Sequence, residues 1–351
     1  MLCIAAKVRA RWVGLRGAVA GVCLGISSVY AQPIPWIDVH VHLLATDLAG
    51  ARVLAAEAVA FAQSQGMRTI FLFPPPQMNQ SSLLDGPEFS AALEEYGDRV
   101  AFLGGGASLN PILQEAANRT PSASEVEAYR RRAEVIAKSG AKGFGEIALH
   151  HLSMTSKHPY EMVSADHPFL KVLMDVAAAH DLPIDLHFDP ILAQATLPEA
   201  LRGNKNPATF APNVEGFERL LAYNRAARVV WAHAGGGDDF GAFTPHLVTR
   251  LLTEHPNLYL SLRPRSKRPG AILGTGERND EWLAVVESFP DRFVMGSDSF
   301  FVQSSRGGAA QDFAERLGAQ TQAIRRVLQF LTPETARKVA RGNAVRLYHL
   351  N

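Results

Sequence analysis

The sequence is nearly free of cysteine. Its two cysteines, Cys3 and Cys23, both lie within the first 31 of its 351 residues. If these 31 residues are removed as a leader, the remaining chain has no thiol, which excludes disulfides, thiolate nucleophiles and cysteine-ligated metals. Any metal site in the remaining chain must therefore use nitrogen and oxygen ligands.

Acidic residues are absent from the same leader. A basic start is followed by an apolar run from Ala18 to about Ile26, and small or aliphatic residues precede a cleavage point after Ala31. This pattern predicts a secretory signal peptide at 1–31 and a periplasmic or secreted location for residues 32–351. The apolar run is short for a membrane span, so we expect no stable anchor after cleavage; an uncleaved anchor is the alternative reading.

A large excess of charge of one sign is also lacking. The net charge of the chain is +1, and the leader holds four of the 35 basic residues and none of the 34 acidic ones. Residues 32–351 therefore carry a net charge of −3. This balance gives no general reason to bind nucleic acid or an anionic membrane, so we expect a small-molecule substrate.

No Gly-x-Gly-x-x-Gly turn follows the first predicted strand, which disfavours the rival fold, a doubly wound open sheet. Short apolar segments predict eight strands, at 36–43, 68–73, 99–103, 141–147, 183–188, 228–233, 257–262 and 292–298. Helical patterns lie between and after them, at 47–65, 88–96, 124–139, 168–180, 214–226, 246–254, 281–289, 311–329 and 333–348. This order predicts an α/β fold, a (β/α)₈ TIM barrel with loop insertions, in one domain at 32–351.

Polar residues occur at the ends of these otherwise apolar strands. In a (β/α)₈ barrel the carboxyl ends of all strands meet on one face, where the active site lies. Burying an imidazole or a carboxylate without a partner is costly, and shared coordination of a metal removes most of that cost. Each residue alone has a structural explanation, but together they predict a metal site: His40, His42, Glu146, His187, His233 and Asp298.

These residues lie in motifs that resemble those of the amidohydrolase superfamily of metal-dependent hydrolases. The matching pieces are Asp38-Val39-His40-Val41-His42, Gly145-Glu146, Leu186-His187, Ala232-His233, Gly296-Ser297-Asp298 and the closing Gly342-Asn343-Ala344-Val345-Arg346-Leu347. The resemblance spans about Trp36 to Tyr348, and the most similar group is the amidohydrolase-related (amidohydrolase 2) branch. It implies a metal-dependent hydrolase and says little about the substrate.

The resemblance implies that His40, His42 and Asp298 hold one metal, that His187 and His233 hold a second, and that Glu146 bridges them. A metal lowers the pKa of bound water toward neutrality, and Asp298 would act as general base and acid. The ligand set fits zinc, with manganese, cobalt, nickel or iron as alternatives. We expect cleavage of an ester, lactone, amide or P–O bond.

A second reading follows from the same resemblance. In a mononuclear decarboxylase, one metal is held by the two histidines of the first strand, the fifth-strand histidine and the aspartate, and His233 is the acid and base. A third reading is a non-catalytic binding protein, which would not need a general base.

Residues near the strand ends are weaker candidates for other roles. A basic loop, Arg263, Arg265, Lys267 and Arg268, follows the seventh strand, and its alternative reading is a solvated turn. Arg263, nearest the strand end, is the residue predicted to bind an anionic substrate group. We expect Asp189 to orient His187. His150 and His151 line the mouth of the site or belong to a loop, and Trp231 packs in the barrel.

Overall fold

The computed structural model describes residues 34–76, 84–264, 270–273, 277–302 and 309–351. All of them belong to one compact unit, Pro33–Asn351. The predicted signal peptide at 1–31 lies outside the described residues and stays a prediction, as do Arg265, Lys267 and Arg268.

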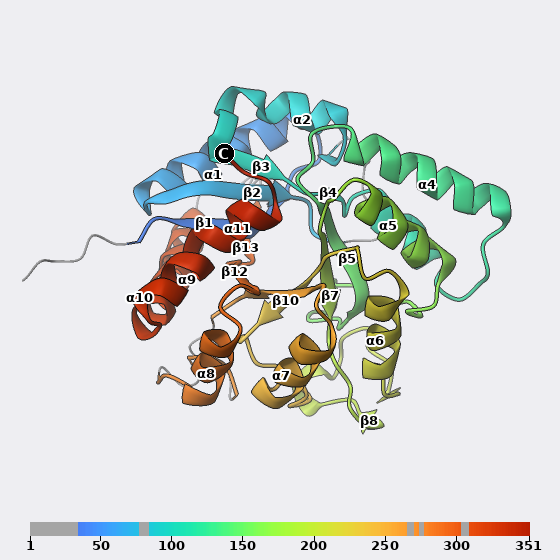
Figure 1. Ribbon diagram of the computed structural model, residues 1–351. Helices are drawn as coiled ribbons and strands as arrows, with labels where there is room; N and C mark the ends of the chain where they lie inside the picture. Colours follow the sequence, from blue (N-terminus) through green and yellow to red (C-terminus); the bar gives the residue numbers. More distant parts are fainter. Residues whose placement is uncertain (1–33, 77–83, 265–269, 274–276, 303–308) are drawn as a thin grey trace, which may run out of the picture. The chain divides into compact units, whose positions relative to one another are not determined.

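The central strands are parallel and follow one another around a ring (Figure 1). One hydrogen-bonded sheet has the order β13-β1-β2-β3, and the second has the order β12-β11-β10-β7-β5-β4. The strands of this ring are β1 (Trp36–Leu44), β2 (Met67–Phe73), β3 (Val100–Phe102), β4 (Gly104–Gly105), β5 (Phe144–His151), β7 (Ile184–Phe188), β10 (Val229–Ala234), β11 (Leu258–Leu262), β12 (Phe293–Met295) and β13 (Ser299–Val302).

The two sheets meet where the chain passes directly from β3 to β4 and from β12 to β13. The predicted strands at 99–103 and 292–298 contain β3 and β12, whereas β4 and β13 follow just beyond these bounds. If each pair is counted as one position, the ring has the eight positions expected of a TIM barrel. The eighth strand was predicted as one segment at 292–298. Only Phe293–Met295 of this segment form a strand, β12, which pairs with β11. Gly296 to Asp298 interrupt the strand, and β13 then pairs with β1 from Val41↔Ser299 onward.

Helices follow most strands and lie outside the ring (Figure 1). They are α1 (Leu48–Ser64), α2 (Pro87–Leu93), α3 (Leu109–Glu115), α4 (Ala123–Ala137), α5 (Pro168–Ala179), α6 (Val214–Tyr223), α7 (Pro245–Glu254), α8 (Asp280–Ser288), α9 (Ala309–Phe330), α10 (Pro333–Arg337) and α11 (Asn343–Leu347). The single helix predicted at 333–348 contains a π-helical turn, Lys338–Gly342, between α10 and α11. Helix α3 was not predicted.

Helix α1 shows why these segments form helices. Its N-cap Asp47 accepts a hydrogen bond from the Gly50 amide, and its buried residues recur every three or four positions. Leu54, Ala58 and Ala62 belong to the large core between the helices and the strands. A separate cluster inside the ring packs Tyr348 and Leu347 against strand residues such as Ile37, Val230 and Val294.

Strand β5 is longer than predicted. The sequence placed its end at Ile147 and assigned His150 to an inserted loop. In the structure β5 continues to His151 because the short strand β6 (Glu161–Met162) pairs with it antiparallel, with His151 opposite Glu161. A second short pair, β8 (Ala195–Thr196) and β9 (Thr209–Phe210), lies between the predicted strand at 183–188 and the predicted helix at 214–226.

Among the described residues, none of the helices is both long enough and apolar enough to cross a membrane.

Candidate metal centre

The two histidines of β1 converge on one point. Their Nε2 atoms are 3.1 Å apart, and both side chains are buried. A register shift between Asp38 and Val41 interrupts the pairing of β1 with β2. Val39 therefore packs inside the ring, whereas Val41 belongs to the outer core. The shift leaves His40 and His42 facing the same centre.

Asp298 reaches this centre from the break between β12 and β13. Its amide donates to the His40 carbonyl at 2.9 Å, and Asp38 accepts from the Ser297 amide at 2.9 Å. The Oδ1 atom of Asp298 lies 3.3 Å from His42 Nε2. Asp298 has a positive φ of 52°, a conformation that costs free energy in a non-glycine residue and is often found at functional sites.

Gly296 is required for this approach. A Cβ atom built there would lie 2.8 Å from the His40 Cβ and 2.2 Å from the Ser261 Oγ. The absence of a side chain thus allows the end of β12 to pass beside the first ligand strand.

Glu146 of β5 lies between two groups of donor atoms. Its Oε2 is 3.3 Å from His42 Nε2 and 3.7 Å from His40 Nε2. Its Oε1 is 2.8 Å from His187 Nδ1 and 3.2 Å from His233 Nε2. The two oxygens of one buried carboxylate therefore face different pairs of histidines.

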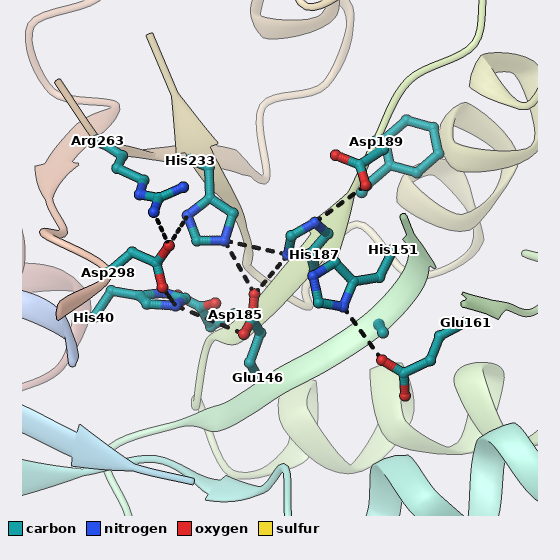
Figure 2. Close-up of polar contacts among 12 residues, drawn as sticks. His40, Glu146, His151, Glu161, Asp185, His187, Asp189, His233, Arg263 and Asp298 are labelled. Atoms are coloured by element: carbon teal, nitrogen blue, oxygen red, sulfur yellow. Dashed lines mark hydrogen bonds and ion pairs between the residues drawn. The ribbon is translucent and has the colours of Figure 1, made fainter. Parts of the chain in front are cut away.

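The second pair of histidines comes from β7 and β10. His187 Nδ1 and His233 Nε2 are 3.2 Å apart. His233 has a positive φ of 68°, so both it and Asp298 use left-handed backbone at the end of a strand. Figure 2 shows that side chains from separate strands point toward Glu146. All six residues predicted for the metal site lie together.

Carboxylates outside this group fix the orientation of two imidazoles. His40 Nδ1 lies 3.2 Å from Asp185 Oδ2, and His187 Nε2 lies 3.4 Å from Asp189 Oδ2 (Figure 2). Because a carboxylate accepts hydrogen bonds, these nitrogens carry the protons. The other nitrogens, His40 Nε2 and His187 Nδ1, then present lone pairs to the centre.

This arrangement fits divalent metal ions. Lone pairs of imidazole nitrogen face carboxylate oxygens of Glu146 at 2.8 and 3.7 Å, and only a proton or a cation relieves such a contact. Donors about 2.0–2.1 Å from a tetrahedral zinc ion are roughly 3.4 Å apart, close to the spacings found here. Two of the three candidate ligand groups among the described residues lie here and share His40: His40, His42 and Asp298, and His40, Glu146 and His233. The third, Glu218, Glu254 and His255, contains none of the predicted ligands.

Burial and neighbouring charges shift the pKa values of the side chains in this group. Burial lowers the pKa of His187, but Asp189 and Glu146 more than offset it and raise this pKa to about 10. Burial opposes ionisation of Glu146 and Asp298 as well, yet neighbouring cationic groups hold both pKa values well below their usual range. Burial lowers the pKa of His233 to about 3.

Arg263 follows β11 and contacts the centre through Asp298. Its guanidinium lies 2.5 Å from Asp298 Oδ2. Both residues line a cavity of about 280 Å³ whose wall includes every predicted ligand except His40. Other lining residues are His151, Met154, His158, Asp189, Asp238, Asp239 and Phe300.

The remaining predictions have different outcomes. Asp189 does lie beside His187, and buried Trp231 packs in the barrel, stacked on Phe243. His151 lines the cavity, whereas His150 is buried and bonds to the Asp189 carbonyl. Asp185 was missed, although it stands two residues before His187 on the same strand and is fully buried.

The profile of the amidohydrolase family matches residues 37–350. No protein among the curated sequences matches the chain. Similar solved structures include a lactonase template engineered for organophosphate hydrolysis, with 17% identity, coverage of 90% of this chain and 95% of that chain, and a TM-score of 0.50. A mutant lactonase of Deinococcus radiodurans has 16% identity, coverage of 90% and 96%, and a TM-score of 0.49. Dihydroorotase of Saccharomyces cerevisiae has 11% identity, coverage of 90% and 84%, and a TM-score of 0.47.

Proposed function

Because the chain belongs to the amidohydrolase family of metal-dependent hydrolases, we propose that it cleaves an ester, lactone or amide bond, or a P–O bond, of a small anionic molecule. One observation carries this proposal. Donor atoms from β1, β5, β7, β10 and the β12–β13 break surround Glu146, and its two oxygens face two groups of them. That arrangement suits a pair of metal ions bridged by one carboxylate.

In this proposal His40, His42 and Asp298 hold one ion, His187 and His233 hold the other, and Glu146 bridges. A divalent metal, with zinc the first choice and manganese, cobalt, nickel or iron the alternatives, supplies a water of lowered pKa and a Lewis acid when bound. The nitrogen and oxygen donors of the set suit these ions.

The side chains of the protein supply the proton transfers and the orientation. Asp298 accepts the proton of the attacking water and returns it to the leaving group. His233 Nδ1, buried and 3.9 Å from Asp298 Oδ2, assists this transfer. Arg263 keeps Asp298 ionised and offers its guanidinium to an anionic group of the substrate at the cavity wall.

Metal analysis and an activity panel test the proposal together. The purified protein should hold two divalent ions per chain and hydrolyse at least one member of a panel of lactones, esters, amides and phosphate esters. Asp298→Asn should lower kcat by about 10²–10⁴-fold while at least one metal is retained. The control Asp291→Asn changes an exposed carboxylate that pairs with Lys338, and should have wild-type kinetics.

Two results would contradict the proposal. A metal-loaded protein that hydrolyses no member of the panel would refute the hydrolase assignment. One ion per chain, with release of CO₂ from carboxylated substrates, would support the mononuclear decarboxylase instead.

The proposed location is outside the cytoplasm, and its support is the sequence of the first 31 residues. Cell fractionation and N-terminal sequencing of the purified protein test this. The expected N-terminus is Gln32, and a protein that begins at Met1 in the soluble cytoplasmic fraction would refute it.

A further inference from the structure

His151 lies at the metal centre but belongs to neither group of proposed ligands. The antiparallel pairing of β5 with β6 places it opposite Glu161. Its ring packs on the ring of His187, with centroids 3.7 Å apart, and it lines the cavity that contains Asp298 and Arg263. An imidazole so placed needs an explanation beyond the binding of metal.

A chain of buried hydrogen bonds fixes the side chain next to it. The amide of Ala148 donates to Asn110 Oδ1 at 2.9 Å, and a backbone N–H can only donate. Asn110 Nδ2 must therefore point the other way, and it donates to Glu161 Oε1 at 2.8 Å. Asn110 is 0% exposed and Glu161 is 1% exposed, so neither group exchanges this contact for water.

The second oxygen of Glu161 faces His151. Glu161 Oε2 lies 3.3 Å from His151 Nδ1 (Figure 2). Above the raised pKa of Glu161, its ionised carboxylate accepts a hydrogen bond at this distance, so Nδ1 carries the imidazole proton and Nε2 carries a lone pair. Among the described residues, Nε2 has no hydrogen-bond partner, and it is not one of the unpartnered atoms that protein covers completely. The His151 side chain is 12% exposed and lines the cavity, so Nε2 is the ring nitrogen left to meet a ligand there.

We propose that His151 is a substrate-contacting residue whose Nε2 accepts a hydrogen bond from an N–H or O–H group beside the scissile bond. Glu161 and Asn110 are positioning residues that select this tautomer. The inference rests on the proposed hydrolase function and narrows its substrates to secondary amides and to esters or lactones with a neighbouring hydroxyl group. Arg263, on the same cavity, provides the complementary donor for an anionic group.

The variant Glu161→Gln tests the tautomer directly. Asn110 still donates to the side-chain oxygen at position 161, so the new amide NH₂ must point at His151 Nδ1. His151 is then forced to carry its proton on Nε2, with almost no change in shape. Nitrogen NMR of the imidazoles, recorded at pH 9, should show Nδ1–H in the wild type and Nε2–H in the variant. A wild-type His151 protonated on Nε2 at this pH would overturn the inference.

Paired substrates test the contact. They differ only by methylation of the donor: a secondary amide against its N-methyl form, and a hydroxy ester against its methoxy form. In assays at pH 9, where Glu161 is ionised, the wild type should prefer the unmethylated member by about 10- to 100-fold in kcat/KM, the value of one buried hydrogen bond with its unsatisfied partner. Glu161→Gln and His151→Leu should lose this preference while the metal content stays that of the wild type.

The chain offers a matched control. His180 bonds to Glu134 at 2.8 Å on the outer helices, so Glu134→Gln alters another histidine–carboxylate pair away from the cavity. This control should keep both the tautomer of His151 and the substrate preference. Hydrolysis with equal rates for both members of every pair would overturn this inference alone. No hydrolysis of any substrate would overturn the proposed function and this inference with it.

Discussion

Replacement of Glu146 by Gln gives the most direct test of the metal centre. The change keeps the size of the side chain but removes its negative charge, and both carboxylate oxygens lie within 2.8–3.3 Å of a histidine nitrogen. We expect the variant to bind fewer metal ions than the wild type. The reason is that its amide group has one donor end and so cannot face both pairs of histidines as an acceptor.

The magnitude follows from the distances. A unit charge about 4 Å from another is worth roughly 4 kcal/mol at the effective dielectric constant of a protein site, and each ion carries two charges closer than that. The loss of the Glu146 charge should therefore cost each ion at least about 4 kcal/mol, or roughly 10³-fold in affinity. At micromolar metal, the content should fall from two ions per chain to one or fewer.

Elemental analysis after dialysis measures the stoichiometry, and competition with a chromogenic chelator measures the affinities. Glu287→Gln is the control, since Glu287 accepts hydrogen bonds from Thr332 and Thr335 outside the site. A Glu146→Gln protein that kept two tightly bound ions per chain would refute the bridging role, whatever its activity.

Further predictions concern residues that surround the ligands. Asp185→Asn should weaken metal binding by about 10–100-fold, measured with the same chelator, because Asp185 orients His40; unchanged affinity would exclude this role. Gly296→Ala should lower both the melting temperature and the metal content, since the added methyl group overlaps Ser261 and His40. Burial raises the pKa of Glu161 from 4.5 to about 7, so the stability from its neutral form is complete below pH 4.5 and is lost as the pH rises through 7. Relative to pH 4, Glu161→Gln should therefore gain up to about 3 kcal/mol over the wild type at pH 8 in urea unfolding; parallel pH profiles would contradict this.

The ligand set could be predicted from the sequence because parallel strands share one end. His40, Glu146, His187 and His233 each interrupt an apolar strand near its carboxyl end, and a closed ring of such strands brings those ends to one face. This argument does not require knowing which residues, far apart in the sequence, contact one another. The break in the eighth strand was not foreseen, although Gly296, Ser297 and Asp298 are all residues that favour turns. The role of Gly296 depends on the position of His40, which lies on another strand.

The residues around the ligands could not be predicted in the same way. Asp185 shares a face with His187, and this alternation was a usable signal, but its partner His40 lies 145 residues away on another strand. The pairing of His151 with Glu161 depends on the short strand β6, and the segment between them resembled an irregular insertion. Contacts of this kind depend on which two elements pair, and the local sequence of one element does not show which other element it will contact.

Three histidines of the site share one feature: a carboxylate accepts a hydrogen bond from one of their two ring nitrogens. Asp185 holds His40, Asp189 holds His187 and Glu161 holds His151, in each case at one ring nitrogen and at 3.2–3.4 Å. In the first two, the nitrogen left with a lone pair faces Glu146, where cations bind in our proposal. In the third, it faces the cavity. A carboxylate that selects a tautomer thus prepares one nitrogen to accept, and the position of that nitrogen decides whether it accepts a metal ion or a hydrogen-bond donor of the substrate. The buried carboxylate of Glu161 costs folding free energy above its raised pKa, which is the kind of cost expected at a functional position rather than in a purely structural contact.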